Sequence, residues 1–181
     1  MNGIQAGIKT LSYVTNGLQA GIKNEAFVRV NGVQAGIDNL ASSLVGIQTG
    51  YKNHANGYGI QAGIKNNTSD FYGLQTGIKN QSEQDMTGVQ LGLQNKVEEY
   101  FDGIQIGLIN FAKKGNYLQI GLLNIKGVQS LKELTKDKDW HEKLTILYGY
   151  NREGKGASSQ RKKKRMSNKE KIMDRGKIYY L

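Results

Sequence analysis

Few residues in this chain can do acid–base, nucleophilic or metal chemistry. The sequence holds two histidines, His54 and His141, and no cysteine, so both a thiolate zinc site and a disulfide framework are excluded. Neither histidine lies in a recognisable nucleophile motif, and we interpret both as structural. The spacing of Gly57, Gly59 and Gly63 does not fit a dinucleotide-binding loop, and the segment after them is a predicted strand rather than a helix. We therefore expect no enzyme, no catalytic residue, no metal and no cofactor.

The side chains that recur at fixed spacing are amides. Gln returns every 13 to 15 residues inside the pattern Gly-Φ-Gln-x-Gly-Φ-x-Asn, where Φ is apolar, and a last Gln follows early at position 129. The repeated glutamines are Gln5, Gln19, Gln34, Gln48, Gln61, Gln75, Gln90, Gln105 and Gln119. The asparagines that close the repeats are Asn24, Asn39, Asn53, Asn66, Asn80, Asn95, Asn110 and Asn124. Self-similarity over most of the chain predicts a repeat architecture.

Alternating side chains identify the element that positions these amides. In the second repeat, Leu18 and Ala20 point to one side and Gln19 and Gly21 to the other, and a period of two is that of a strand. We expect the apolar side to face the core and Gln to face solvent. A second short segment follows each Asn, so each unit of about 14 residues reads as two strands and two turns. The fold class is predicted to be all-β.

Two all-β architectures fit this spacing. In a β-solenoid of about nine to ten coils, equivalent strands stack in parallel about 4.8 Å apart. The alternative is an antiparallel β-meander, which Asn16-Gly17 and Asn31-Gly32 favour as hairpin turns. Stacked in register, Gln and Asn amides can form hydrogen-bonded ladders that demand one residue type, whereas a meander separates the copies by about 10 Å, two strand spacings. Stacked lysines would repel one another, but their long side chains can splay apart, so we favour the solenoid.

The chain divides by composition and charge into three parts. Residues 1–126 form the predicted β-repeat array, 127–150 a C-terminal cap, and 151–181 a basic tail that we expect to be disordered. The chain has 181 residues and a net charge of +10, and most of this charge lies in the tail. Five consecutive cations are the possible polyanion contact. They are Arg161, Lys162, Lys163, Lys164 and Arg165.

Partners and compartment are less constrained. No apolar run approaches the length that spans a bilayer, and the N-terminus has neither the basic start nor the apolar stretch of a signal peptide. An open stack of strands has unpaired edges. We expect residues 1–10, the uncapped N-terminal edge, to associate with another copy of the chain.

The repeats carry a resemblance to known families. Four copies of Gln-x-Gly-x-x-Asn-x-Ala, which begin at Gln19, Gln34, Gln48 and Gln105, are similar to the curlin repeat of bacterial amyloid fibres. More closely, the whole array over residues 2–129 resembles bacterial surface-repeat proteins. The resemblance implies a cell-surface or secreted location and a structural or surface-binding role. The alternatives are a curlin-like fibre-forming subunit and an intracellular polyanion or nucleic-acid binder that acts through the basic tail.

Overall fold

The computed structural model describes residues 2–152, and these are nearly all sheet. Strand accounts for 85% and helix for 5%, which confirms the all-β prediction. The elements, in order, are β1 (Asn2–Thr68), β2 (Phe71–Ser82), β3 (Asp85–Lys126), α1 (Leu131–Leu134), α2 (Trp140–Lys143) and β4 (Leu144–Asn151). The four strands form one open sheet in the order β1-β2-β3-β4.

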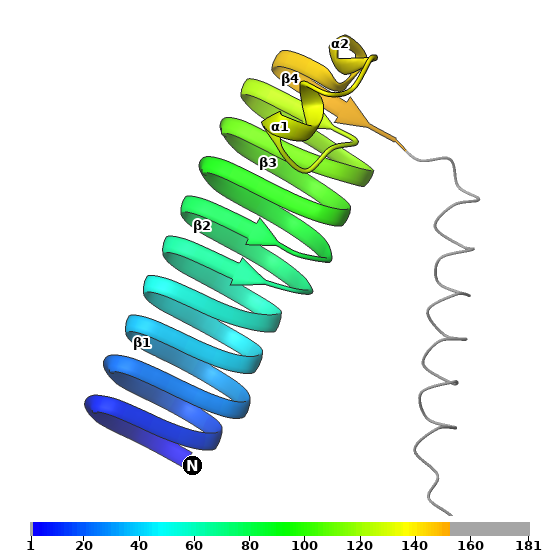
Figure 1. Cartoon of the computed structure of the whole chain (residues 1–181). Coiled ribbons are helices and arrows are strands. Elements are labelled where there is room, and N and C mark those ends of the chain that lie inside the picture. The colour runs from blue at the N-terminus through cyan, green and yellow to red at the C-terminus, as the bar shows by residue number, and fades with distance from the viewer. Residues whose placement is uncertain (1, 153–181) are drawn as a thin grey trace, which may run out of the picture. The chain divides into compact units, whose positions relative to one another are not determined.

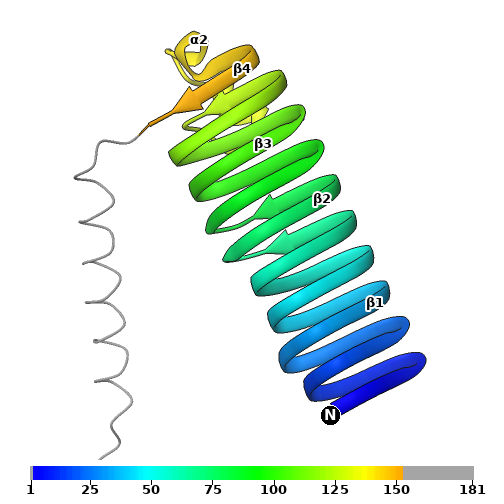
Figure 2. The ribbon, with the colours of Figure 1, turned by 180° about the vertical axis from the view of Figure 1, so that it is seen from behind.

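Successive repeats lie side by side and in register. Figure 1 shows the ribbon of β1, β2 and β3 winding through successive turns, and Figure 2 shows the same turns from behind. The pairing is parallel: Gln61 of β1 lies opposite Gln75 of β2, and Gln75 lies opposite Gln90 of β3. Each residue therefore pairs with its equivalent one repeat later, which is not the pairing that an antiparallel meander requires.

One prediction about this strand is wrong, because its two sides are exchanged. Gln19 is fully buried, whereas Ile22, which we expected to face the core, is 53% exposed. The same inversion holds along the array, with every repeated Gln from position 19 onward buried and the apolar neighbours on the outside. An amide can take the inner side because the copy in the next repeat supplies its hydrogen-bond partner.

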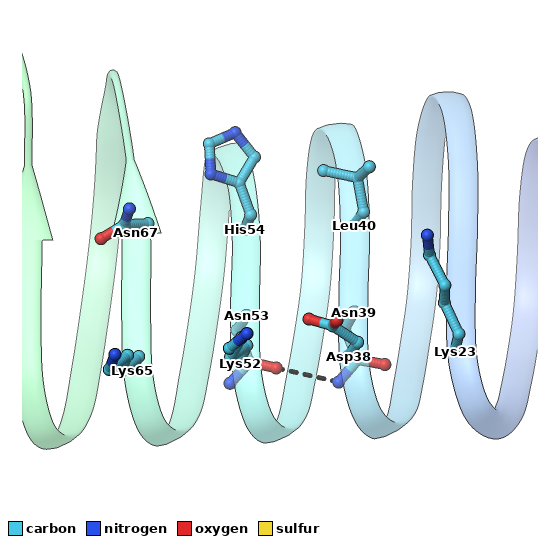
Figure 3. A pocket seen from close by; sticks show the side chains of 9 residues that line it. All are labelled: Lys23, Asp38, Asn39, Leu40, Lys52, Asn53, His54, Lys65 and Asn67. Atoms are coloured by element: carbon cyan, nitrogen blue, oxygen red, sulfur yellow. Dashed lines mark hydrogen bonds between the residues drawn. The ribbon is translucent and has the colours of Figure 1, made fainter.

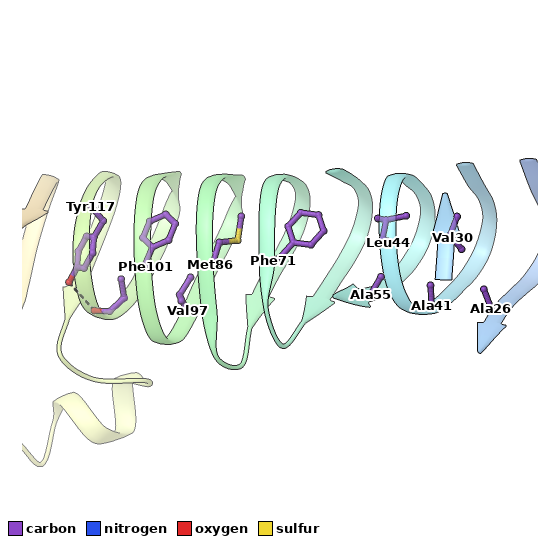
Figure 4. Close-up of a cluster of buried hydrophobic side chains, with 11 residues drawn as sticks. Ala26, Val30, Ala41, Leu44, Ala55, Phe71, Met86, Val97, Phe101 and Tyr117 are labelled. Carbon is purple, nitrogen blue, oxygen red and sulfur yellow. Dashed lines mark hydrogen bonds between the residues drawn. The ribbon is translucent and has the colours of Figure 1, made fainter. Parts of the chain in front are cut away.

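The interior is narrow and is filled by columns of equivalent side chains. Beside the amides run a column of small residues, such as Ala41 and Ala55, and a column of larger ones that includes Leu44, Phe71 and Phe101. Figure 4 shows these side chains inside successive turns of the ribbon. A small residue stands beside a large one at most levels, so the two columns together fill the space between the walls.

The two glycines of each repeat are required for different reasons, one for backbone conformation and one for space. Gly32, which precedes Gln34, has φ +138°, a conformation that side chains rarely adopt. Gly36 has ordinary φ, but a Cβ there would overlap the backbone carbonyl of Gly21 and lie 2.6 Å from the Nδ2 atom of Asn24. The first glycine therefore makes the turn, and the second leaves room for the amide of the preceding repeat.

The segment after the array covers its C-terminal end. β4 pairs antiparallel with the last repeat, so that Gly149 lies opposite Gln119. Before it, Ser130 caps the N-terminus of α1, where its Oγ accepts a hydrogen bond from the Glu133 amide, and Leu134 of α1 is buried in a second apolar cluster. The edge that the last repeat would otherwise expose is thus paired by a strand of opposite direction.

Candidate binding face and amide ladders

The glutamines form one continuous ladder. Nε2 of each Gln donates to Oε1 of the Gln in the preceding repeat, from Gln19 to Gln5 through to Gln119 to Gln105, at 2.7 to 3.2 Å. In several repeats the second N–H donates to a backbone carbonyl within the same repeat, as from Gln105 to Phe111 at 3.2 Å. The predicted glutamine ladder is confirmed, although it lies inside the array.

The asparagines form a second ladder that runs the opposite way. Nδ2 of each Asn donates to Oδ1 of the Asn in the following repeat, from Asn24 to Asn39 through to Asn110 to Asn124, at 2.8 to 2.9 Å. Its other N–H donates to a backbone carbonyl of that following repeat at 2.8 to 3.1 Å. The predicted asparagine ladder is also confirmed.

The two ladders supply most of the hydrogen-bond partners that the buried polar side chains need. Among residues 2–152, every buried side-chain nitrogen or oxygen has a hydrogen-bond partner. Thr10 takes the place of Asn in the first repeat, and its Oγ1 donates to Asn24 Oδ1 at 2.5 Å. The ladder amides are thus engaged with one another and are not available to bind a ligand.

The outer side of the same strand is apolar over the whole length of the array. Three columns of residues make up this surface, which we call the apolar face: the residue before each Gln, the residue after it and the residue three positions after it. The first column is Ile4, Leu18, Val33, Ile47, Ile60, Leu74, Val89, Ile104 and Leu118. The middle column is Ala6, Ala20, Ala35, Thr49, Ala62, Thr76, Leu91, Ile106 and Ile120. The third column is Ile8, Ile22, Ile37, Tyr51, Ile64, Ile78, Leu93, Leu108 and Leu122.

None of these face positions is buried, and none carries a charge. Exposure remains high in mid-array, at 48% for Ile78 and 53% for Leu93. Because soluble monomers rarely expose one contiguous apolar patch larger than a few hundred Å², this face is the candidate contact surface of the described residues. It was missed in the sequence analysis. The signal was present, because only an interior ladder explains why Gln never varies while its neighbours change freely.

A cationic corner borders the third column. Lys23, Lys52 and Lys65 lie one residue further along their repeats, and Asp38 interrupts their row. A hollow of about 360 Å³ opens beside them, with His54 at its rim (Figure 3). Figure 3 also shows the ladder bond from Asn39 to Asn53 just behind this corner. The charged side chains stand at the solvent edge, so the expected repulsion between stacked lysines is relieved by solvent and by Asp38.

The remaining candidates do not assemble into a reactive centre. In the described part of the chain, no three His, Asp or Glu side chains come together as metal ligands would. His54 lies in β1 beside the hollow described above, and His141 lies in α2 beside Trp140, with 6.1 Å between the two ring centroids. No helix within residues 2–152 is long and apolar enough to cross a membrane. The possible polyanion contact at 161–165 lies outside the described residues.

No protein-family model matches this sequence, and no curated protein or solved structure matches it. The geometry of the apolar face and of the ladders behind it therefore carries the functional argument.

Proposed function

We propose that this chain is a non-enzymatic structural or surface-binding repeat protein, a β-solenoid of nine to ten coils that acts through its apolar face. The parallel register of β1, β2 and β3 supports the solenoid. The proposed organisation keeps a repeat array at 1–126, a cap at 127–150 and a basic tail at 151–181.

The observation that carries this proposal is the apolar face itself. Its three columns hold no charged residue over nine repeats, although each face position lies on the solvent side of the strand, where Lys or Glu would cost nothing in packing. The ladders behind the face keep the strands in register, so the columns are straight and regularly spaced. A regular, uncharged surface of this kind suits contact with another extended surface.

Support for contact rather than catalysis comes from the interior. Every buried polar side chain within residues 2–152 is an amide or a hydroxyl, and the amides are engaged in the ladders. General acid–base chemistry needs ionisable groups held in a water-excluding site. Among residues 2–152, no Lys, Arg, His, Asp or Glu side chain is buried.

The test is to place charges on the face of the full chain. We expect the double variant Ile78→Lys and Leu93→Lys to lose both adsorption to an octyl matrix and any self-association of the wild type. Val28→Lys is the matched control, because Val28 is also exposed, at 50%, but lies in the second strand of its repeat. If the double variant behaves like the wild type in both assays, the face has no binding role and the proposal is wrong.

A curlin-like fibre subunit is the second candidate, and the in-register amide ladders favour it. A fibre would extend the stack from the N-terminal repeat, the edge that we also expect to mediate self-association. Seeded growth of thioflavin-positive fibrils with a cross-β diffraction pattern would support this candidate. Unchanged soluble protein after prolonged incubation with seeds would reject it.

A further inference from the structure

We infer that the partner of the apolar face is a second copy of this chain, packed face to face with the two repeat arrays running in opposite directions. This inference rests on the proposed function, because it names the occupant of the same face. Two observations carry it: the size of the face and a gradient of side-chain size along its middle column.

The size of the face matches what a stable dimer needs. Ten rows at about 4.8 Å span about 45 Å along the array. The face is three outward side chains wide, roughly 15 to 20 Å. The resulting area, about 700 to 900 Å², is close to the roughly 800 Å² that each partner contributes to a standard interface.

The middle column of the face changes in size from one end to the other. Its first rows hold Ala6, Ala20 and Ala35, whereas its last rows hold Leu91, Ile106 and Ile120. The N-terminal rows are therefore a groove between the two outer columns, and the C-terminal rows are filled level with them.

β4 adds a tenth row of large side chains. Tyr148 lies opposite Ile120 in the sheet, and Tyr150 lies opposite Leu118. Both tyrosines are largely exposed, at 68% and 75%, so they extend the middle and first columns of the face. The cap strand thus continues the apolar face instead of ending it.

A twofold axis along the strand direction brings the large rows of one copy over the small rows of the other. Counting repeats from Gln5, row 1 then faces row 10, row 2 faces row 9 and row 3 faces row 8. Tyr148 meets Ala6, Ile120 meets Ala20, and Ile106 meets Ala35. Sheets that pack face to face interdigitate in this way at about 10 Å separation.

A parallel arrangement has no such fit. It would set each row against its own copy, which leaves a gap between alanines at one end and crowds isoleucines at the other. The antiparallel arrangement also tolerates the charges at the rim: Lys23 then faces Leu123 and Lys52 faces Gln94, and only Lys65 and Lys79 approach each other, at the solvent edge.

A size exchange tests this pairing. We expect Ala35→Ile to overfill its row and Ile106→Ala to leave a gap, so that each weakens dimerisation at least tenfold in sedimentation equilibrium. The double variant, which restores one large and one small residue at each contact, should recover the wild-type dissociation constant. Both positions lie on the outer side of the strand, so circular dichroism and the thermal midpoint report that the fold is kept. Additive losses in the double variant would overturn the antiparallel pairing.

Spin labels define the arrangement independently, because the chain has no cysteine of its own. In the antiparallel face-to-face dimer, a label at Lys23→Cys should lie about 34 Å along the array from its partner and one at Lys65→Cys about 5 Å, from the strand spacing. A dimer through the N-terminal edges reverses this order. A parallel face-to-face dimer places the labels of each pair at the same level on opposite rims, so that the two separations are equal. Either of those patterns would overturn the inference.

A monomer at concentrations near 100 µM would also overturn it, and two further measurements then separate the outcomes. Binding of the monomer to anionic phosphatidylserine vesicles, lost in Ile78→Lys with Leu93→Lys, would make a lipid surface the occupant and keep the proposed function. A monomer that binds neither vesicles nor an octyl matrix would reject both the dimer and the proposed function.

Discussion

The inner and outer sides of one strand differ in what each requires of a residue. On the inner side, Gln recurs from position 19 to 119 without exception, whereas on the outer side Ile, Leu, Val, Ala, Thr and Tyr replace one another freely. An interior amide must match its neighbours in length and in donors and acceptors, because an unmatched partner stays buried without a hydrogen bond. An outer position needs only to be uncharged. Along this strand the inner side therefore requires one residue type, whereas the outer side requires only a similar character.

The interior glycine gives the largest contrast between the two sides. A Cβ at Gly77 would overlap the Gly63 backbone carbonyl and lie 3.0 Å from Asn66 Nδ2, so the two repeats would have to separate. We expect Gly77→Ala to cost about 4 kcal/mol or more, measured by urea unfolding. The neighbouring residue Thr76 faces outward, and Thr76→Ala should change the free energy of unfolding by less than about 0.5 kcal/mol. Equal stability of the two variants would show that the register is looser than described.

The next largest loss of stability is expected when residue types are exchanged between the two sides of the strand. Gln75→Leu would leave Gln61 Oε1 without its donor at 2.8 Å and Gln90 Nε2 without its acceptor at 2.7 Å. Two buried polar groups left unpaired predict a loss of about 2 to 4 kcal/mol in the free energy of unfolding. Leu74→Gln places the same amide on the outer side and should cost less than about 0.5 kcal/mol. A larger loss for Leu74→Gln than for Gln75→Leu would reverse our assignment of the two sides.

The spacing of residues predicted the all-β class and the ladders, because both depend on a period that the sequence displays. The direction in which each side faces was predicted wrongly. Alternation alone separates Leu18 from Gln19, but it does not say which of them is buried, and the usual preference for burying leucine pointed the wrong way. Burial of Gln19 becomes favourable only when Gln5 and Gln34 stand at hydrogen-bond distance, a property of the stack and not of one repeat.

The same preference for burying apolar residues also explains why the sequence analysis did not predict the apolar face. Once Ile22 and Ile37 were assigned to the core, nothing remained in the array to suggest a contact surface. The specific contacts that the sequence suggested were therefore the N-terminal edge at residues 1–10 and the five cations at 161–165, which lie outside the described residues. The size gradient from Ala20 to Ile120 was visible in the sequence, but it has meaning only when these residues share one exposed column.

The N-terminal end of the asparagine ladder tests whether an inner position requires Asn, because the first repeat has Thr10 there. Thr10 donates one hydrogen bond to Asn24 Oδ1, where an Asn would donate one to that oxygen and a second to a backbone carbonyl. We expect Thr10→Val to cost about 1 kcal/mol and Thr10→Asn to be neutral or slightly stabilising. Hydrogen exchange over residues 2–24 is the measurement, because the effect is confined to this end. Faster exchange in Thr10→Asn than in the wild type would show that the ladder does not extend by simple repetition.

The smallest effect that we expect is a pH dependence of β4 that the repeat array does not share. The hydrogen bond from the Lys143 ammonium lowers the pKa of Asp137, and the same contact raises the pKa of Lys143. A carboxyl whose pKa is lowered by folding contributes stability above its ordinary pKa and loses it as the pH falls through the lowered value. Acidification should therefore lower the hydrogen-exchange protection factors of β4, taken against the intrinsic exchange rate at each pH, before it affects those of the ladders, whose interior side chains do not titrate. Asp137→Asn should remove this pH dependence of β4 while exchange in the array stays the same at each pH. If β4 and the array lose protection together in the wild type, the two regions unfold as one unit and the contrast between them does not extend to pH.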